Sequence, residues 1–276
     1  MKIGIIGLGL IGGSLAMSIR RHTEHAVFGY DIDGDTMLRA RATEAIHDAL
    51  DDDALPACDI VLVALYPQLC ADWIIAHADR FGPKTLVIDC AGVKRHVFRQ
   101  VAGVAARHSW TYIGGHPMAG REFSGFAYAR GDLFENASMI LCPPAEADIA
   151  AREAAKAFFL EAGFRMVRFC TPEAHDQMIA YTSQLAHVVS GAYVKNPLAA
   201  RHKCFSAGSF LDMTRVARMN EGMWTELFLE NDDLLLPALE DLIMRLNEYR
   251  DALASRDPEK LLPVLREGRI CKEALD

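Results

Sequence analysis

The chain has 276 residues, of which 51% are hydrophobic, so it is long enough to bury a core in one large or two ordinary domains. Its formal net charge of -8 argues against nucleic acid or an anionic membrane surface as the main partner, because both attract clustered Lys and Arg. We expect the local basic pairs Arg20–Arg21 and Lys94–Arg95 to be solvated.

No run reaches the roughly 18 apolar residues of a membrane span. The seven cysteines, never spaced as C-x-x-C, predict reduced, mostly buried thiols in a cytoplasmic protein without a zinc site.

The first predicted strand, residues 2–6, runs directly into a glycine-rich loop that precedes a helix-like stretch. Gly7 lets the chain turn off the strand, Gly9 removes a side chain from the path of a pyrophosphate, and Gly12 lets the helix pack closely on the sheet. The pyrophosphate of a dinucleotide would lie at the positive end of that helix. The predicted cofactor contacts therefore include the loop residues Gly7, Leu8, Gly9, Leu10, Ile11 and Gly12.

An acidic residue, Asp31, closes the next apolar segment, residues 26–30. A carboxylate accepts hydrogen bonds from both hydroxyls of an adenosine ribose but repels a 2′-phosphate, so NAD is favoured over NADP. The alternative is that Asp31 only caps the following helix, a role that Asp33 or Asp35 could also fill.

Further strand-like runs alternate with helix-like ones up to about residue 170. This alternation predicts an α/β fold with a Rossmann-type, doubly wound and mostly parallel sheet. The expected strands are 58–65, 85–89, 110–115, 138–142 and 165–169, and the expected helices are 67–80, 94–107 and 146–162.

The pattern changes at Thr171, which can cap a helix that has Pro172 at its first position. Beyond it the apolar period is helical throughout, in the stretches 172–194, 207–219, 221–254 and 258–272. We therefore expect a dinucleotide-binding domain over residues 1–170 and an all-helical domain over residues 171–276. Leucines of the third stretch, such as Leu246, suit an internal core or a dimer seam, and we favour a homodimer because so small a helical domain has little core of its own.

A dehydrogenase also needs a group that takes the substrate's hydroxyl proton, and histidine is the usual choice. His116 follows a predicted strand within a tight Gly- and Pro-containing loop, so it should lie at the carboxyl edge of the sheet, where ligands of such folds bind. The small residues around Gly92, after the preceding strand, would permit close approach of a nicotinamide ring. The alternatives are a loop histidine that bonds only backbone and an ordinary turn capped by Asp89.

Five segments together closely resemble the prephenate/arogenate dehydrogenases of tyrosine biosynthesis, in the right order along essentially the whole chain. They are the Gly7-to-Gly12 loop, Asp89-x-x-Gly92-Val93-Lys94, Gly115-His116-Pro117-Met118-Ala119-Gly120, Ser183-Gln184-Leu185-Ala186-His187, and Asp212-Met213-Thr214-Arg215-Val216-Ala217 with Met223-Trp224.

The resemblance implies oxidation of prephenate at its ring C4 hydroxyl, hydride transfer to NAD+, and loss of the ring carboxylate as CO2 to give 4-hydroxyphenylpyruvate. It assigns the catalytic roles to His116, His187 and Arg215, where His116 polarises the hydroxyl and Arg215 binds a substrate carboxylate. The other residues matched to the substrate pocket are Ser183, Glu122, Asp212 and Trp224. From the helical pattern alone, His187 would pass for an interior histidine, and His175 on the same helix is as plausible a candidate.

This chain departs from the family pattern at two positions. Where relatives commonly have a serine whose hydroxyl helps to orient the catalytic histidine, this chain has Gly92, so water or another donor must replace it. Where many relatives have a small polar residue, this chain has Arg121, which we expect to supply a second contact to a substrate carboxylate.

Three other functions compete with this interpretation. Arogenate differs from prephenate only in carrying an amine in place of the side-chain ketone, and the neutral donor His187 favours the keto acid. A β-hydroxyacid dehydrogenase of similar architecture is disfavoured by the segments around His116 and Arg215. A sensor or scaffold that binds NAD without turnover would need neither residue.

Overall fold

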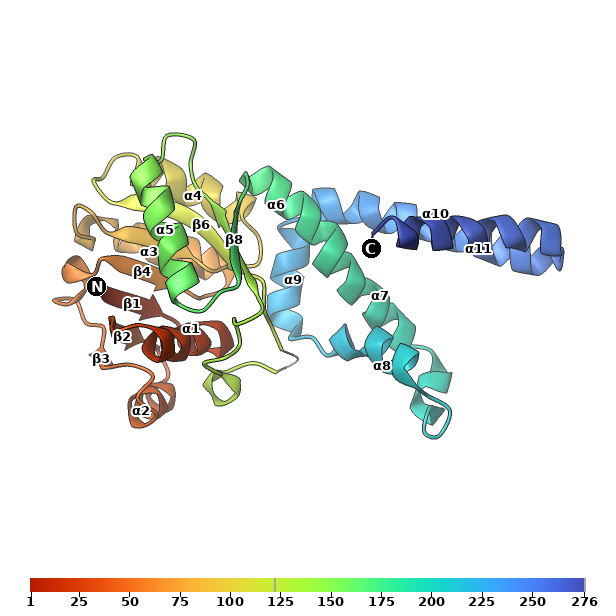
Figure 1. Cartoon of the computed structure of the whole chain (residues 1–276), viewed down its shortest axis with the longest axis horizontal. Helices are drawn as coiled ribbons and strands as arrows, with labels where there is room; N and C mark the ends of the chain where they lie inside the picture. Colours follow the sequence, from red (N-terminus) through yellow and green to blue (C-terminus); the bar gives the residue numbers. More distant parts are fainter. Residues whose placement is uncertain (122, 276) are drawn as a thin grey trace.

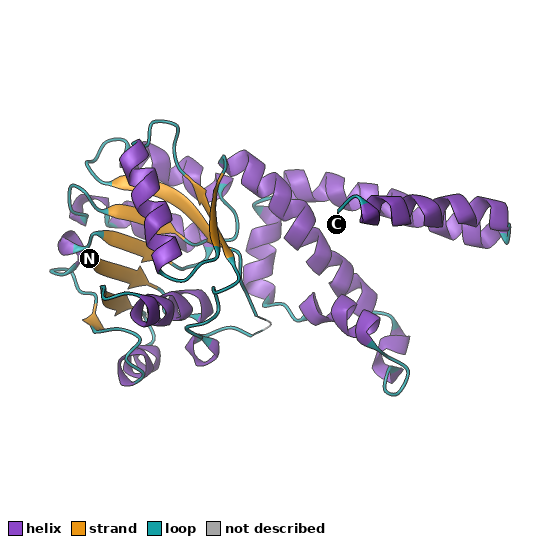
Figure 2. Cartoon of the chain, viewed as in Figure 1, coloured by secondary structure: helices purple, strands orange, loops and turns teal. Residues whose placement is uncertain are grey.

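The computed structural model describes residues 1–121 and 123–275, and within them one eight-stranded sheet lies at one end of the molecule while helices alone form the other end (Figures 1 and 2). The strand order is β3-β2-β1-β4-β5-β6-β7-β8. The strands are β1 Lys2–Ile6, β2 Ala26–Tyr30, β3 Asp48–Ala49, β4 Ile60–Val63, β5 Leu86–Asp89, β6 Thr111–Pro117, β7 Ser138–Cys142 and β8 Met166–Phe169.

Both faces of the sheet are buried, which explains why its central strands are apolar without interruption. In β4, Ile60 and Leu62 pack into one core with α1 (Leu10–His22) and α5 (Ile149–Glu161). Val61 and Val63 point the other way, into a core with α3 (Pro67–Ala76) and α4 (Arg95–Ala105). A short helix, α2 (Gly34–Ala42), packs beside β2 (Figure 1). The predicted α/β class and doubly wound sheet are confirmed.

The first six strands run parallel to one another, whereas β7 pairs antiparallel with β6, from Gly114 opposite Cys142 to Pro117 opposite Met139. The described part of the β6–β7 connection contains only a 3-10 turn at Phe126–Tyr128 and no crossover helix. A parallel return requires such a crossover, so the chain reverses direction here. The parallel order places the carboxyl ends of β1, β4, β5 and β6 along one edge of the sheet.

The C-terminal part consists of helices only, and α10 and α11 form a long hairpin that projects away from the sheet (Figure 1). The helices are α6 Pro172–Ile179, α7 Leu185–Val194, α8 Gly208–Thr214, α9 Glu221–Leu229, α10 Asp232–Ser255 and α11 Pro258–Glu273. A π-helical turn, Ala180–Gln184, joins α6 to α7. Thr171 caps α6 by accepting a hydrogen bond from the Ala174 N–H, as the sequence predicts.

The expected single helix over 221–254 is wrong, because it is divided at Asn231 into α9 and α10. Asn231 is fully buried, and its side-chain amide donates to the Asp176 carbonyl at 3.0 Å and to Gln184 Oε1 at 2.8 Å. The backbone leaves helical geometry there (φ -132°, ψ 22°), which turns the side chain toward these partners.

All seven cysteines carry free thiols, and four of them are buried, whereas Cys204 and Cys271 are exposed. Across residues 1–121 and 123–275, no helix has both the length and the apolar character needed to cross a membrane.

Candidate active site

The three glycines of the first loop differ in what surrounds them. Gly7 has a φ of +80°, and a Cβ there would lie 2.6 Å from the Ala64 carbonyl oxygen. A Cβ on Gly12 would lie 1.8 Å from the Gly7 oxygen, so the chain itself requires both glycines. At Gly9, no described atom lies within 4 Å of an added Cβ. Packing gives no reason for this glycine, whereas close approach of a pyrophosphate does.

The helix that follows the loop offers its first turn to an anion. Gly9 is the N-cap of α1 and provides no side-chain acceptor, and the first turn contains no acidic residue. Its amides are therefore left for a bound anion, which the helix dipole also favours. Leu10 and Ile11 lie in this first turn. The Leu8 side chain is buried, so Leu8 can contact a bound cofactor only through its backbone. The loop thus fits the pyrophosphate of NAD.

Asp31 holds the glycine loop and does not cap α2. One carboxylate oxygen accepts from the Leu8 N–H at 2.7 Å and the other from the Asp33 N–H at 2.9 Å. The cap of α2 is Asp33, which accepts from the N–H groups of Asp35 and Thr36. The helix-cap alternative for Asp31 is therefore wrong, and its position at the end of β2 suits a ribose contact.

Substitution of Asp31 with Asn is expected to raise the KM for NAD about tenfold and to weaken discrimination against NADP, because a charged acceptor for the ribose hydroxyls is lost. Initial rates with each cofactor measure both effects. Asp33→Asn is the matched control, since it alters the α2 cap and should leave the ratio of the two cofactors unchanged. An unchanged ratio in Asp31→Asn would contradict the ribose role.

A buried ion pair lies beneath the predicted nicotinamide edge. Lys94 and Asp89 are both fully buried, and Lys94 Nζ bonds to Asp89 Oδ1 and to the Gly115 carbonyl. Tyr112 donates its hydroxyl to Asp89 Oδ2 at 2.7 Å. The expectation that Lys94–Arg95 is solvated is therefore wrong, because Lys94 neutralises a carboxylate that the end of β5 places in the core. Asp89 also accepts from the Ala91 N–H at 3.0 Å, but it does not cap α4, whose N-cap residue is Lys94.

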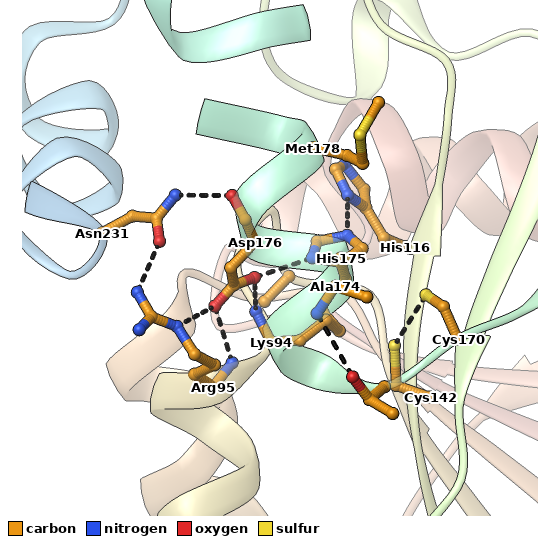
Figure 3. Close-up of polar contacts among 12 residues, drawn as sticks. Lys94, Arg95, His116, Cys142, Cys170, Ala174, His175, Asp176, Met178 and Asn231 are labelled. Atoms are coloured by element: carbon orange, nitrogen blue, oxygen red, sulfur yellow. Dashed lines mark hydrogen bonds and ion pairs between the residues drawn. The ribbon is translucent and has the colours of Figure 1, made fainter. Parts of the chain in front are cut away.

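His116, at the end of β6, contacts a second histidine and through it a carboxylate (Figure 3). His116 Nδ1 lies 2.8 Å from His175 Nε2, and His175 Nδ1 lies 2.7 Å from Asp176 Oδ1. Burial lowers the pKa of His116 well below its usual value, and nearby His175 and Lys94 act in the same direction. His116 is therefore a neutral imidazole at physiological pH, as a proton acceptor must be.

Asp176 is fixed by hydrogen bonds from both ends of the molecule. Its carboxylate accepts from the N–H groups of Lys94 and Arg95 at 2.7 and 2.9 Å, and from Arg95 Nε at 3.2 Å. Arg95 is held in turn by Asn231 Oδ1 at 2.7 Å (Figure 3). It also bonds to Asp233. Burial acts to raise the pKa of Asp176, but the hydrogen bonds from His175 and the two amides outweigh it, so the pKa is lowered.

A second group of predicted residues meets in the helical part. The ring centroids of His187 on α7 and Trp224 on α9 lie 3.8 Å apart. His187 Nδ1 bonds to the Ser183 carbonyl at 2.8 Å. Burial lowers the pKa of His187, and the charge of Arg215 adds to this, while the Ser183 carbonyl opposes it. His175 and His187 lie about 18 Å apart along α6 and α7. The contacts of the described residues do not join His187 to His116.

The remaining predicted site residues are placed differently. Ser183 is half-buried in the π-turn, whereas Asp212 and Arg121 are exposed, and among the described residues neither has a hydrogen-bond or ion-pair partner. Glu122 lies outside the described residues. At Gly92 an added Cβ would lie 3.0 Å from Leu227 Cδ2, so a larger residue would displace that leucine.

Sequence reasoning missed the role of Asp176, and it considered His175 only as an alternative to His187. One sequence signal was available, since a His-Asp pair follows directly on the Thr171 cap and therefore lies in the first turns of the helix nearest the sheet. The partners Lys94 and Asn231 come from distant segments, and only the fold brings them together.

Comparison with known proteins places this site in a family. Residues 15–168 match the family model described as prephenate dehydrogenase, nucleotide-binding domain, and residues 171–267 match prephenate dehydrogenase, dimerization domain. The cyclohexadienyl dehydrogenase of Zymomonas mobilis is 31% identical over 282 residues, which cover 99% of this chain and 95% of that protein. The A. aeolicus prephenate dehydrogenase, solved in complex with hydroxyphenyl propionate and NAD+, superposes with a TM-score of 0.86 at 26% identity, covering 100% of this chain and 98% of that one. Synechocystis arogenate dehydrogenase gives 0.82 at 26% identity, covering 100% of each chain. With both domain models matched in order, this chain belongs to the prephenate dehydrogenase family.

Proposed function

We propose that this protein is an NAD-dependent dehydrogenase that converts prephenate to 4-hydroxyphenylpyruvate and CO2. The observation that carries the proposal is His116, a half-buried imidazole at the carboxyl end of β6, on the same edge of the sheet as the glycine loop. A base there and a dinucleotide loop beside it are what oxidation of a ring hydroxyl requires.

The chain's own residues divide the work of the reaction. His116 accepts the C4 hydroxyl proton, so the O–H electron pair becomes the C4 carbonyl as the C4 hydride departs. When bound, NAD+ supplies the hydride acceptor. The C–CO2 bond of the ring carboxylate then breaks, its electron pair enters the ring, and the C4 carbonyl electrons move onto the oxygen, which takes the proton back from His116 to become the phenol hydroxyl. Loss of CO2 and aromatisation make the step effectively irreversible. The loop from Gly7 to Gly12 and Asp31 hold the cofactor, and Gly92 leaves room beside its nicotinamide.

The substrate's two carboxylates require specific cations in an acidic protein. We assign one carboxylate to Arg215 and the other to Arg121, with Ser183, His187 and Trp224 lining the pocket and Glu122 and Asp212 at its entrance. A neutral His187 beside Arg215 suits the side-chain ketone of prephenate better than the ammonium group of arogenate, which Arg215 would repel.

The discriminating experiment measures NADH formation with prephenate and with arogenate, each with NAD and with NADP. We expect turnover with prephenate and NAD. Turnover with arogenate alone would replace the proposed substrate with that amino acid. Activity with neither would leave an NAD-binding sensor or scaffold, because the same fold can bind NAD without turning over a substrate.

Replacement of Arg215 with Ala is expected to raise the KM for prephenate by about 10- to 100-fold, since a charge-assisted hydrogen bond is worth about 1.5–3 kcal/mol. The KM for NAD should stay constant. Arg121→Ala should raise the KM for prephenate as well, and an unchanged value would remove Arg121 from the pocket. Arg201→Ala, on the exposed 3-10 turn Pro197–Arg201, is the control for loss of a surface charge.

We further propose that the protein is a homodimer built on the α10–α11 hairpin. Leu227 on α9 and Leu235 on α10 are buried within the chain. Many other apolar side chains of α10 and α11 are about half exposed or more. A monomer rarely leaves so much apolar surface in water, and the match to a dimerization domain over residues 171–267 supports a second copy as the occupant. The exposed residues are Leu236, Ile243, Met244, Leu246, Leu253, Leu262, Leu265 and Ile270.

Sedimentation velocity tests the dimer. The double variant Leu236→Arg/Ile243→Arg places two charges one heptad apart on α10 and should shift the protein from dimer to monomer. Asp241→Arg changes the net charge equally on another face of α10 and should leave the dimer intact. A monomeric unmodified protein would overturn the proposal.

We also propose that the enzyme is located in the cytoplasm. Seven free thiols, of which two are exposed, are compatible with a reducing compartment. Fractionation of cells that produce the protein would test this.

A further inference from the structure

We propose that His175 and Asp176 are positioning residues for His116: they fix which ring nitrogen of His116 carries the proton, and they stabilise the positive charge that His116 acquires. The inference rests on the proposed function, in which His116 is the base. His175 and Asp176 touch neither substrate nor cofactor in this scheme. They act through the 2.8 Å contact between His116 Nδ1 and His175 Nε2.

The proton positions follow from the chemistry of the three groups in turn. An ionised carboxylate only accepts hydrogen bonds, so His175 Nδ1, 2.7 Å from Asp176 Oδ1, must carry a proton. A neutral imidazole has one N–H, so His175 Nε2 is left as an acceptor. His116 Nδ1 must then donate to it, and His116 Nε2 is left with the lone pair that a base needs.

This direction holds only while His175 is neutral and Asp176 is charged, and the surroundings favour both states. His175 is 1% exposed, and its burial lowers its pKa, although the hydrogen bond to Asp176 opposes the effect. Asp176 accepts from two backbone amides and from Arg95, and these donors would be left without a charged acceptor if it were protonated. A protonated His175 would reverse the direction and put a proton on His116 Nε2.

The same contact acts during the reaction. As the substrate O–H bond breaks, an N–H bond forms at His116 Nε2, and the half-buried ring becomes a cation. Its Nδ1–H remains bonded to His175 Nε2, and the charge is balanced by Asp176 on the far side of His175. A cation that is largely removed from water is costly without such a partner, so the His175–Asp176 pair lowers the barrier to proton uptake.

The position that could otherwise supply an orienting hydroxyl carries no side chain in this chain. Residue 92 is glycine, and a serine Cβ there would meet Leu227 at 3.0 Å. His175 therefore takes the place of the serine hydroxyl, because its Nε2 bonds to His116 and orients the ring.

Two substitutions at His175 separate its two contacts. Gln places an amide oxygen near the Nε2 position and can still accept from His116. Asn places its amide near the Nδ1 position, where it can still donate to Asp176 but cannot reach His116. We expect His175→Asn to lower kcat by about 100-fold or more, because His116 loses its tautomer, and His175→Gln to lower it less than tenfold.

Michaelis constants and a control variant separate positioning from damage to the fold. The KM values for prephenate and NAD should stay within about twofold of the original in both variants, because uniform binding is not altered. His108→Asn removes a similar His–Asp contact, 2.9 Å to Asp79, far from the site and should leave kcat unchanged. Equal losses of kcat in the Asn and Gln variants, or no loss in either, would overturn the proposal.

A second readout needs no substrate, so it separates failure of this inference from failure of the proposed function. Nitrogen-15 NMR of labelled histidine identifies which His116 nitrogen carries the proton in the unliganded protein. We expect Nδ1–H in the unmodified protein and in His175→Gln, and a shift toward Nε2–H in His175→Asn. An Nε2–H tautomer of His116 in the unmodified protein would overturn the inference even if the enzyme is active on prephenate.

Discussion

Replacement of His116 with Asn is expected to lower kcat by about 100- to 10,000-fold, the range for loss of a positioned proton acceptor. Asn is the informative choice because its amide can still donate toward His175 Nε2 while nothing replaces the Nε2 lone pair of His116. The surrounding hydrogen bonds therefore survive and the base alone is lost. Single-turnover NADH formation at saturating prephenate and NAD measures the effect on the chemical step.

The KM for NAD serves as the internal control, since the glycine loop and Asp31 are untouched. Undiminished turnover in His116→Asn would remove His116 from the mechanism. The pH dependence of the rate also tests His116. Because the pKa of His116 is lowered below 6.5, its imidazole stays unprotonated as the pH falls through 6.5. The acidic limb of kcat/KM should therefore lie below pH 6.5, and protonation of His116 should abolish activity only there.

Replacement of Lys94 with Met is expected to destabilise the protein by about 3–5 kcal/mol, the usual cost of breaking a buried ion pair. Lys94 and Asp89 are both 0% exposed, and removal of the ammonium group leaves the carboxylate with only the Tyr112 hydroxyl and the Ala91 N–H. The Gly115 carbonyl also loses its donor. Urea unfolding followed by circular dichroism gives the free energy of unfolding.

The double variant Asp89→Asn/Lys94→Met tests the cause. If an uncompensated charge is the reason for the loss, removal of both charges should recover part of the stability. Arg107→Met, which removes an exposed charge just beyond the end of α4, should change the stability by less than about 0.5 kcal/mol. A Lys94→Met protein as stable as the original would show that Asp89 does not depend on the ammonium group.

The sequence predicted the sheet well because its signals are local. Uninterrupted apolar runs such as β4, glycines that force a turn at Gly7, and the Thr171–Pro172 start of α6 each act within a few residues. The antiparallel β7 and the break at Asn231 depend instead on contacts between distant segments. At Asn231 the helical period continues in the sequence, and a buried side-chain amide overrides it.

The site residues also fall into those that local sequence signals predict and those that depend on contacts between distant segments. The glycine loop, Asp31 and His116 follow from strand ends and could be placed from the sequence, and the family resemblance supplied His187 and Arg215. Lys94 was expected in water because its neighbours in sequence gave no sign of the Asp89 carboxylate that pairs with it. His175 and Asp176 gained their meaning only when α6 was seen to pack beside β6. Arg121, Arg215 and the other pocket residues stay predictions until substrate kinetics test them.

The hydrogen bonds around Asp176 also connect the two ends of the molecule mechanically. Asp176 and His175 belong to α6, whereas the amides of Lys94 and Arg95 and the ring of His116 belong to the sheet end (Figure 3). A hydrogen bond of 2.8 Å is lost with a displacement of about 1 Å. A displacement of α6 relative to the sheet by that amount would therefore break the contact between His116 and His175. The orientation of the His116 ring therefore depends on how α6 packs against the sheet, so a substitution at that junction can lower kcat without altering any residue of the pocket.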